Sequence, residues 1–328
     1  GGVFVYYREP NQFQERCMAS NPVRLGIIGV GFGTVVQIPG FQSEGVEVAA
    51  VCARREDRAR EAAERFQIPN VFTDYEEMVK ADFLDAVSIV SPVPLHYPMT
   101  IAALNAGKHV LCEKPFTLNQ GEARELWEKS KALNLTTMIT HEFRFASGRM
   151  RVKELIDEGY LGSLHMAKIS LVNGPRASLR PRPYTVRDDL DQGGGFLSGL
   201  GSHYIDCLRH WFGEVTSVQG YATTHLGERI IPDTDEKAMA TADDTFNFTL
   251  EFASGGWATM TGTTAAPFGP GGKIEIYGSN GALVTPHQGA GVNPPPHGTI
   301  LGAQIGDEEL RDIEIPDRLQ PFADDRDD

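Results

Sequence analysis

The fold is decided by the stretch Val23-Arg24-Leu25-Gly26-Ile27-Ile28-Gly29-Val30-Gly31-Phe32-Gly33-Thr34, which reads as an apolar strand followed by a glycine turn. Gly29 permits a tight turn, and Gly31 lets a pyrophosphate approach the backbone at a helix N-terminus. The strict fingerprint has Gly or Ala at position 34, where this chain has Thr34 beside Gly33. The stretch predicts dinucleotide binding through Gly29, Gly31, Phe32 and Gly33, with a plain tight turn as the alternative.

Short apolar runs alternate with helical stretches from Val23 to about Thr140. The expected strands are 23–28, 46–52, 86–90, 109–112 and 137–140, and the expected helices are 56–66, 75–80, 98–106 and 119–133. Strand–helix alternation with such short connections is typical of βαβ units, whose parallel sheet is covered on both faces. Residues 22–143 are therefore expected to form an α/β, Rossmann-type, doubly wound parallel sheet.

The pattern changes after about Arg144. Helices are expected over 149–158 and up to about 212, and then the strands 215–224, 245–252, 256–263, 273–277 and 282–285 follow without helices. Ser254-Gly255 and Asn280-Gly281 are typical hairpin turns. Residues 144–328 are therefore expected to form an α+β domain for substrate binding, with a large, mainly antiparallel open sheet. The open face of such a sheet predicts a homodimer or homotetramer.

Length and charge exclude several classes of protein. A chain of 328 residues favours two domains, and its net charge of −14 argues against nucleic-acid and membrane partners. No apolar run approaches the ~18 residues that span a bilayer. Four cysteines without a CxxC or zinc spacing predict buried, reduced thiols and a cytoplasmic protein. Residues 1–21 lack periodicity and are expected to be an N-terminal extension outside the fold.

The end of the second strand bears on the choice of cofactor. Val51-Cys52 is followed by Ala53-Arg54-Arg55 rather than by the acidic residue that binds the ribose diol of NAD. Two guanidinium groups suit a 2′-phosphate, so we expect Ala53, Arg54 and Arg55 to contact the cofactor and NADP to be preferred. The alternative is that both arginines are solvated. Because the acidic Glu56 and Asp57 lie nearby, NAD remains the alternative cofactor.

Two further motifs follow later strands of the predicted parallel sheet. Ser91-Pro92-Val93-Pro94-Leu95-His96 and Cys112-Glu113-Lys114-Pro115 stand at carboxyl ends, where open α/β sheets bind their ligands. Taken singly, Lys114 is more often a surface lysine than a catalyst, and a structural role for His96 is as frequent as a functional one. Their placement beside the glycine turn favours a site made of Ser91, Pro92, His96, Glu113 and Lys114.

The second half carries a glycine-rich run, Gly193-Gly194-Gly195-Phe196-Leu197-Ser198-Gly199-Leu200-Gly201, that leads into a helix. His203 and Asp206 are three residues apart and therefore share a helical face. A lone helical histidine is usually a core residue, and no third ligand has metal-site spacing, so no metal is expected.

Together these motifs resemble the Gfo/Idh/MocA family of NAD(P)-dependent oxidoreductases, which act mainly on sugars and cyclitols. The resemblance spans roughly residues 22–315 and rests on these matching segments: Gly29-x-Gly31, Pro92 with His96, Ala106-Gly107-Lys108-His109-Val110-Leu111-Cys112-Glu113-Lys114-Pro115, Gly193-Gly194-Gly195, and Gly201-x-His203-x-x-Asp206. It implies a dehydrogenase or reductase of CH–OH groups that transfers a hydride between the nicotinamide and a sugar, cyclitol or related polyol. It further implies that Lys114 is the general acid/base and that His203 is its partner beside the substrate hydroxyl.

This chain departs from the family pattern at two positions. Gly199 stands where the family often has Asp, and Val93 replaces a usual Asn. A non-catalytic dinucleotide sensor of the same fold is therefore the alternative to an enzyme. Family chains usually continue past this C-terminus with a helical segment, so we expect the sequence to be truncated there. From position alone, Arg144 and Tyr184 are expected to join Lys114 and His203 in binding substrate oxygens.

Overall fold

The computed structural model describes residues 22–174, 182–234, 236–286 and 299–319. The chain divides into two compact units, Gly1–Thr140 and His141–Asp328. The expected N-terminal extension at 1–21 lies outside the described residues, as does Cys17, the one of the four cysteines that it contains.

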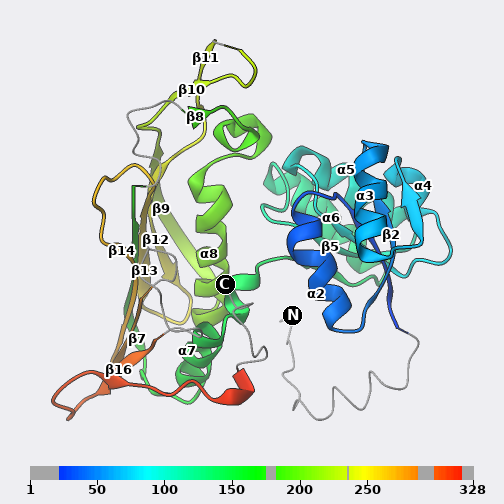
Figure 1. The fold of residues 1–328 in the computed structure, drawn as a ribbon. Helices are drawn as coiled ribbons and strands as arrows, with labels where there is room; N and C mark the ends of the chain where they lie inside the picture. The colour runs from blue at the N-terminus through cyan, green and yellow to red at the C-terminus, as the bar shows by residue number, and fades with distance from the viewer. Residues whose placement is uncertain (1–21, 175–181, 235, 287–298, 320–328) are drawn as a thin grey trace. The chain divides into compact units, whose positions relative to one another are not determined.

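The first unit is built on a six-stranded parallel sheet with the order β3-β2-β1-β4-β5-β6 (Figure 1). The strands are β1 (Arg24–Ile28), β2 (Glu47–Cys52), β3 (Asn70–Phe72), β4 (Ala86–Ile89), β5 (His109–Cys112) and β6 (Thr137–Ile139). This is the strand order of doubly wound dinucleotide-binding folds, and the predicted fold class is confirmed. Strand β3 was not expected, because three residues are too few to show a pattern.

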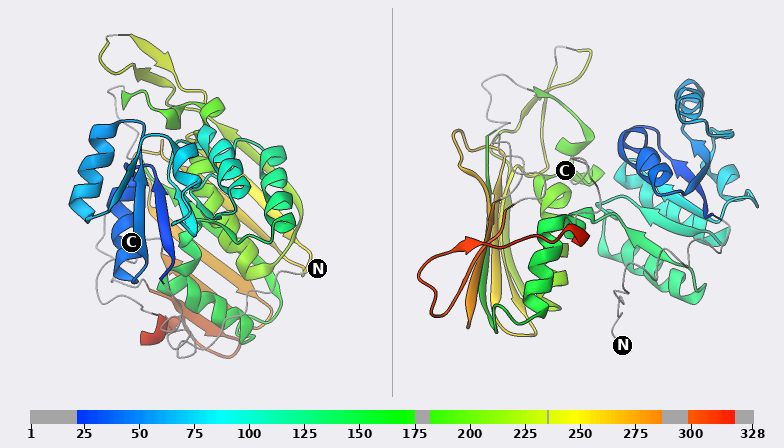
Figure 2. Two further views of the ribbon diagram at one scale, coloured as in Figure 1. Left: turned by 90° about the vertical axis from the view of Figure 1, so that its right-hand side faces the viewer. Right: turned by 60° about the horizontal axis from the view of Figure 1, so that its bottom comes forward.

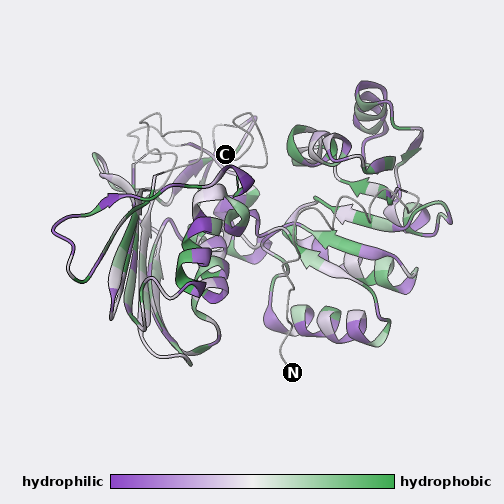
Figure 3. Cartoon of the chain, turned by 90° about the horizontal axis from the view of Figure 1, so that it is seen from below, coloured by the Kyte–Doolittle hydropathy of each residue, from purple (hydrophilic) through white to green (hydrophobic). Residues whose placement is uncertain are grey.

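The helices of the first unit lie on both faces of this sheet. They are η1 (Gly33–Gln37) continuing into α2 (Ile38–Ser43), then α3 (Glu56–Phe66), α4 (Tyr75–Val79), η2 (Val93–Leu95), α5 (His96–Asn105) and α6 (Gln120–Ala132). Helix α3 packs through Ala59, Ala62 and Ala63, whose small side chains allow close approach to the strands. Figure 3 shows the strands mainly on the hydrophobic side of the colour scale, as expected for a doubly covered sheet.

The second unit is built on an eight-stranded sheet with the order β17-β16-β15-β14-β7-β13-β12-β9. The strands are β7 (Leu164–Val172), β9 (Val215–Thr223), β12 (Thr245–Phe252), β13 (Trp257–Thr263), β14 (Gly271–Gly278), β15 (Gly281–Pro286), β16 (Leu301–Gln304) and β17 (Arg311–Asp312). Only the β7–β13 pair is parallel. The mainly antiparallel sheet and both hairpins, β12–β13 and β14–β15, match the expectation. The central strand β7 was missed.

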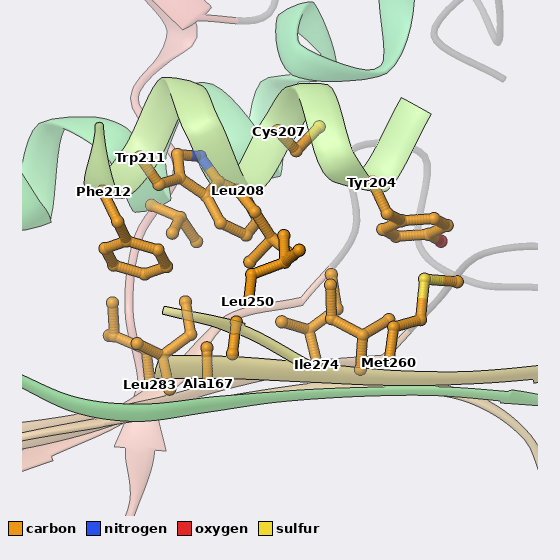
Figure 4. Packing of buried hydrophobic residues seen from close by; sticks show 14 of the residues in the cluster. Ala167, Tyr204, Cys207, Leu208, Trp211, Phe212, Leu250, Met260, Ile274 and Leu283 are labelled. Carbon is orange, nitrogen blue, oxygen red and sulfur yellow. The ribbon is translucent and has the colours of Figure 1, made fainter. Parts of the chain in front are cut away.

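Two helices, α7 (Ser147–Asp157) and α8 (Ser202–Phe212), lie along one face of this sheet (Figure 2). Along β12, Phe246, Phe248, Leu250 and Phe252 are buried and alternate with more exposed residues, so one face of the strand packs in the core. Figure 4 shows Tyr204, Leu208, Trp211 and Phe212 of α8 directed toward this face. The packing of α8 on the sheet therefore fixes the helix that carries His203.

A three-stranded sheet, β11-β10-β8, forms a small separate layer in the second unit. Its strands are β8 (Arg182–Pro183), β10 (Glu228–Ile230) and β11 (Lys237–Met239). Arg229 of β10 donates from Nε to Asp188 Oδ1 at 2.7 Å, and both side chains are buried. Breaking such a pair leaves an uncompensated buried charge, so the pair fastens this layer to the turn that leads to the glycine-rich run.

Candidate active site

Gly29 ends β1 in a conformation that only glycine adopts readily. Its φ is 112°, and its N–H donates to the Cys52 carbonyl oxygen at 2.9 Å. A Cβ at this position would lie 2.4 Å from the carbonyl oxygen of Val90. The turn is therefore pressed against the end of β4, and a side chain would force the two strand ends apart.

The next two glycines of the turn have different surroundings. A Cβ on Gly31 would have no neighbour within 4 Å, whereas Gly33 is buried and its Cβ would lie 3.2 Å from Ile27 Cγ2. Gly33 thus provides the close helix–strand packing that the strict fingerprint assigns to position 34. Thr34 instead holds the loop, because its Oγ1 lies 3.1 Å from the Val30 carbonyl oxygen and 3.0 Å from that of Gly31.

The helix that begins at Gly33 has an open N-terminus. Its first turn contains no acidic residue, and Phe32 at the N-cap makes no side-chain hydrogen bond. Unsatisfied N–H groups and the helix dipole attract a phosphate at such a position. The open space at Gly31 and this uncapped helix start fit the pyrophosphate of a dinucleotide.

The residues after β2 are exposed apart from Ala53, whose N–H donates to the Phe72 carbonyl oxygen at 3.1 Å. Arg55 donates from Nη2 to Asp57 Oδ2 at 2.5 Å. No carboxylate of the described residues pairs with Arg54. The two expected phosphate ligands therefore differ, because Arg55 already has an acidic partner while Arg54 is available to an anion.

A buried hydrogen-bond chain holds Glu113, which precedes Lys114 at the end of β5. Gln37 donates from Nε2 to Glu113 Oε1 at 2.7 Å, and the buried hydroxyl of Ser88 donates to Gln37 Oε1. The other oxygen of Glu113 accepts from the Lys114 backbone N–H at 3.2 Å. The chain therefore links β4, the glycine-turn helix and the loop that carries Lys114, whose side chain is half-buried.

His96 joins two other loops at the same edge of the sheet. The side chain is 1% exposed, with Nδ1 2.9 Å from the Pro115 carbonyl oxygen and Nε2 2.8 Å from that of Ser91. The ring thus ties the loop after β4, which contains Pro92, to the loop after β5. These contacts are structural, and a contact of His96 with the cofactor stays a prediction.

In the second unit, η3 (Glu142–Phe145) packs against α8. The buried ring of His203 stacks on Phe143, with ring centroids 4.0 Å apart and an interplanar angle of 11°. Glu142 Oε1 lies 3.7 Å from His203 Nε2. Arg144 donates from Nε to Asp206 Oδ2 at 2.7 Å, and its Nη2 binds Oδ1, so the guanidinium expected to bind substrate engages a carboxylate of α8.

The glycine-rich run of the second unit is closed by a carboxylate. Asp243 Oδ2 accepts from the backbone N–H of Phe196 at 3.1 Å and of Leu197 at 2.8 Å, at the start of η6 (Leu197–Gly201). Burial is the largest influence on Asp243 and raises its pKa above the ordinary value. Gly195 has a φ of 122°, and its Cβ would lie 2.3 Å from Asp243 Oδ1.

Tyr184 lies beside the small sheet. Its N–H donates to the Ile230 carbonyl oxygen at 2.7 Å. Burial, followed by the nearby carboxylate of Asp189, raises the pKa of its phenol. The contacts described for Tyr184 are thus with this layer, not with His203 or Arg144.

The structure therefore assembles the predicted residues in two groups. The first unit brings its candidates to one edge of the parallel sheet: Gly29, Gly31, Phe32, Gly33, Ala53, Arg54, Arg55, Ser91, Pro92, His96, Glu113 and Lys114. The second unit brings Arg144 and His203 together through η3 and α8. Gln37, Ser88 and Glu142 were missed. The first two are polar residues inside apolar segments, which is the signal that could have drawn attention to them.

Metal-binding clusters and membrane-spanning helices are both absent from the described ranges. In those ranges, no three His, Cys, Asp or Glu side chains come close enough to hold a metal ion. No helix there is long and apolar enough to cross a membrane. Cys52, Cys112 and Cys207 are buried free thiols, and burial raises the pKa of each to about 12.

Two family models match the chain in succession. The oxidoreductase family with an NAD-binding Rossmann fold matches residues 23–141. The GFO/IDH/MocA C-terminal domain matches residues 150–284. The two matches cover most of both units, and the first independently supports a nicotinamide cofactor for the glycine turn.

Named relatives are similar to this chain over most of its length. An uncharacterised oxidoreductase of Synechocystis is 32% identical over 94% of this chain and 84% of its own length. The myo-inositol 2-dehydrogenase of Thermotoga maritima is 28% identical over 80% of this chain and 74% of its own length. The D-glucoside 3-dehydrogenase of Escherichia coli is 30% identical over 73% of this chain and 69% of its own length.

Solved structures share the fold. An oxidoreductase domain protein from Kribbella flavida superposes with a TM-score of 0.81 at 22% identity, covering 90% of this chain and 81% of that one. A levoglucosan dehydrogenase in complex with NADH gives a TM-score of 0.79 at 23% identity, covering 89% and 80%. The paired family matches and the Synechocystis relative establish that the chain belongs to the Gfo/Idh/MocA family of oxidoreductases, as its motifs predicted.

Proposed function

We propose that this protein is an NAD(P)-dependent dehydrogenase or reductase of a hydroxyl or carbonyl group on a sugar, cyclitol or related polyol. The observation that carries the proposal is the edge of the parallel sheet, where the open space at Gly31 and the braced Glu113-Lys114 segment follow neighbouring strands. The named relatives that act on myo-inositol and on D-glucosides support the substrate class.

In the proposed mechanism, Lys114 is the general acid/base and His203 is its partner at the substrate hydroxyl. The nicotinamide supplies hydride transfer, so the protein has to position the substrate and handle one proton. Gln37 and Glu113 hold the Lys114 backbone, and stacking on Phe143 fixes the plane of the His203 ring. A fixed acid/base group contributes roughly 10²- to 10⁴-fold to the rate.

A screen of polyols, aldoses and keto-sugars with both cofactors tests the activity by absorbance of the reduced nicotinamide. Lys114→Ala is expected to lower kcat by about 10²- to 10⁴-fold while the affinity for the dinucleotide stays within twofold. Lys80→Ala, at the exposed C-cap position that follows α4, is the matched control. Near-normal turnover by Lys114→Ala would remove this residue from the mechanism.

We propose NADP as the preferred cofactor, with NAD as the alternative. The support is that a carboxylate is absent at Ala53 and that Arg54 has no acidic partner among the residues the structure describes. The Arg55–Asp57 pair is exposed and therefore weak, so a 2′-phosphate can compete for Arg55. Arg54→Ala is expected to weaken NADPH binding about tenfold and to leave NADH binding unchanged, with Arg58→Ala as control. Equal losses for both cofactors would contradict the assignment.

The alternative function, a dinucleotide sensor without turnover, is favoured by one observation, the glycine at position 199. A sensor binds the reduced cofactor but leaves every substrate in the screen unchanged.

We also propose that copies of the chain associate through the open face of the eight-stranded sheet, where Trp257 and Tyr277 are exposed on β13 and β14. Sedimentation of a monomer at micromolar concentration would contradict that association.

A further inference from the structure

His203 is almost completely enclosed, and Glu142 beside it is not. The histidine side chain is 1% exposed, whereas that of Glu142 is 59% exposed. Glu142 Oε1 lies 3.7 Å from His203 Nε2, about half an ångström beyond hydrogen-bond distance. The carboxylate thus touches a buried ring with one end and water with the other.

The surrounding contacts hold this pair in register. Phe143 stacks on the His203 ring, and His141 contacts its edge, with centroids 5.4 Å apart at 85°. The bidentate Arg144–Asp206 pair fastens η3 to α8 three residues farther along the helix. The contacts of the residues before and after Glu142 therefore hold its carboxylate near His203 Nε2. Attraction between Glu142 and His203 is not needed to keep the two side chains together.

A contribution to folding stability does not explain why the Glu142 carboxylate lies beside His203. An ion pair with a largely exposed partner contributes little to folding, and 3.7 Å is too long for a formed hydrogen bond. The other titratable or charged groups near the ring are His141, Arg144 with Asp206, and Arg149, which lies over Phe143. Unlike these groups, Glu142 is described both by a contact with Nε2 and by a largely exposed side chain.

We propose that Glu142 relays protons between His203 Nε2 and water, an inference that rests on the proposed role of His203 at the substrate hydroxyl. Oxidation of a hydroxyl breaks its O–H bond and releases one proton in addition to the hydride. A proton that reaches the neutral imidazole converts it to an imidazolium with a proton on each ring nitrogen. The imidazolium then gives its Nε2 proton to Glu142 Oε1, which returns the ring to its neutral form, and the carboxyl passes the proton to water. Reduction runs the same path inward, so the carboxylate is restored after each turnover and no further reactant is needed.

The relay is tested with Glu142→Gln, which keeps the shape of the side chain but does not accept a proton. We expect kcat to fall about tenfold to a hundredfold, KM to stay within twofold, and Glu142→Asp to retain part of the activity. Small acidic buffers such as formate should restore kcat of Glu142→Gln in proportion to their concentration, which a structural defect would not allow. Glu214→Gln, an exposed glutamate paired with Arg209 of α8, is the control.

A second readout does not depend on turnover. Exchange of the His203 ring N–H with water, followed by nitrogen-15 NMR, is expected to slow at least fivefold in Glu142→Gln and to stay unchanged in Glu214→Gln. If the protein oxidises nothing in the screen, the proposed function fails, and the exchange rate still decides the relay. Unchanged exchange, or a kcat of Glu142→Gln that is normal and insensitive to buffer, would overturn the relay.

Discussion

Two helices of this protein begin in the same way and are used differently. The runs Gly29–Gln37 and Gly193–Gly201 each lead from glycines into a widened turn and then an α-helix. In the first, the Ile38 N–H donates to the Gly33 carbonyl oxygen, and in the second the Ser202 N–H donates to that of Leu197, a spacing of five residues in both. Such widened turns are frequent at functional sites.

The two helix starts differ in the partner of their first backbone N–H groups. The first helix has no acidic residue in its first turn, whereas the second receives the carboxylate of Asp243 on Phe196 and Leu197. Gly31 faces open space, while Gly195 is enclosed by Asp243. A glycine-rich helix start is therefore an anion site only where the protein has not supplied the anion itself.

The largest effect is expected from Gly195→Ala. Alanine at a φ of 122° is strained, and its Cβ would displace the Asp243 carboxylate, so the unfolding free energy should fall by about 3 kcal/mol or more. Thermal unfolding followed by circular dichroism measures it. Gly199→Ala is the control, because its Cβ meets nothing within 4 Å. Equal unfolding free energies of the two variants would show that the Asp243 carboxylate does not hold the start of the second helix.

Gly31→Asp converts the open helix start into a closed one. The new carboxylate has room and should leave stability within about 0.5 kcal/mol of the wild type. It should compete with the pyrophosphate and raise the Kd for NADPH at least about 100-fold, equivalent to about 2.7 kcal/mol, in a fluorescence titration. Affinity close to the wild-type value would place the dinucleotide elsewhere.

Asp243→Asn is expected to have the smallest effect, and that effect depends on pH. Burial raises the folded-state pKa of Asp243 above 3.8, so its stabilising contribution is full below the unfolded pKa and is lost as pH rises through the folded pKa. Asparagine does not ionise. In urea unfolding, the free energy of unfolding of the variant should therefore rise relative to that of the wild type between about pH 4 and about pH 7. A difference that is constant over this range would contradict the inference.

Most of the strands, helices and turns were predictable because each is encoded by a pattern of residues close together in the sequence. The strand ends at Ile28, Cys52 and Cys112, and the hairpin turns at Ser254-Gly255 and Asn280-Gly281, follow from apolar runs and turn residues. Strand β7 was missed because its outward positions include the apolar Met166 and Val172, which blur the alternation with the buried Ala167, Ile169 and Leu171.

The candidate site was predictable only where a motif is continuous in the sequence. The glycine turn and Glu113-Lys114 are read directly, and topology brings them to one edge of the sheet. Gln37 meets Glu113 across 76 positions, and Glu142 meets His203 only after η3 folds onto α8. Contacts of this kind depend on tertiary packing and leave no spacing signal in a single sequence.

Strand β7 also constrains the order in which the second unit is made. It lies between β13 and β14, yet its parallel partner β13 leaves the ribosome about ninety residues after it. Until both hairpins have been synthesised, the central strand lacks at least one of its two neighbours, and backbone pairing groups along its edge are open to other chains. The long sequence separation of these pairings makes closure of the sheet a late and slow event. We therefore expect nascent chains that end before β14 to be the form of this protein most dependent on chaperones.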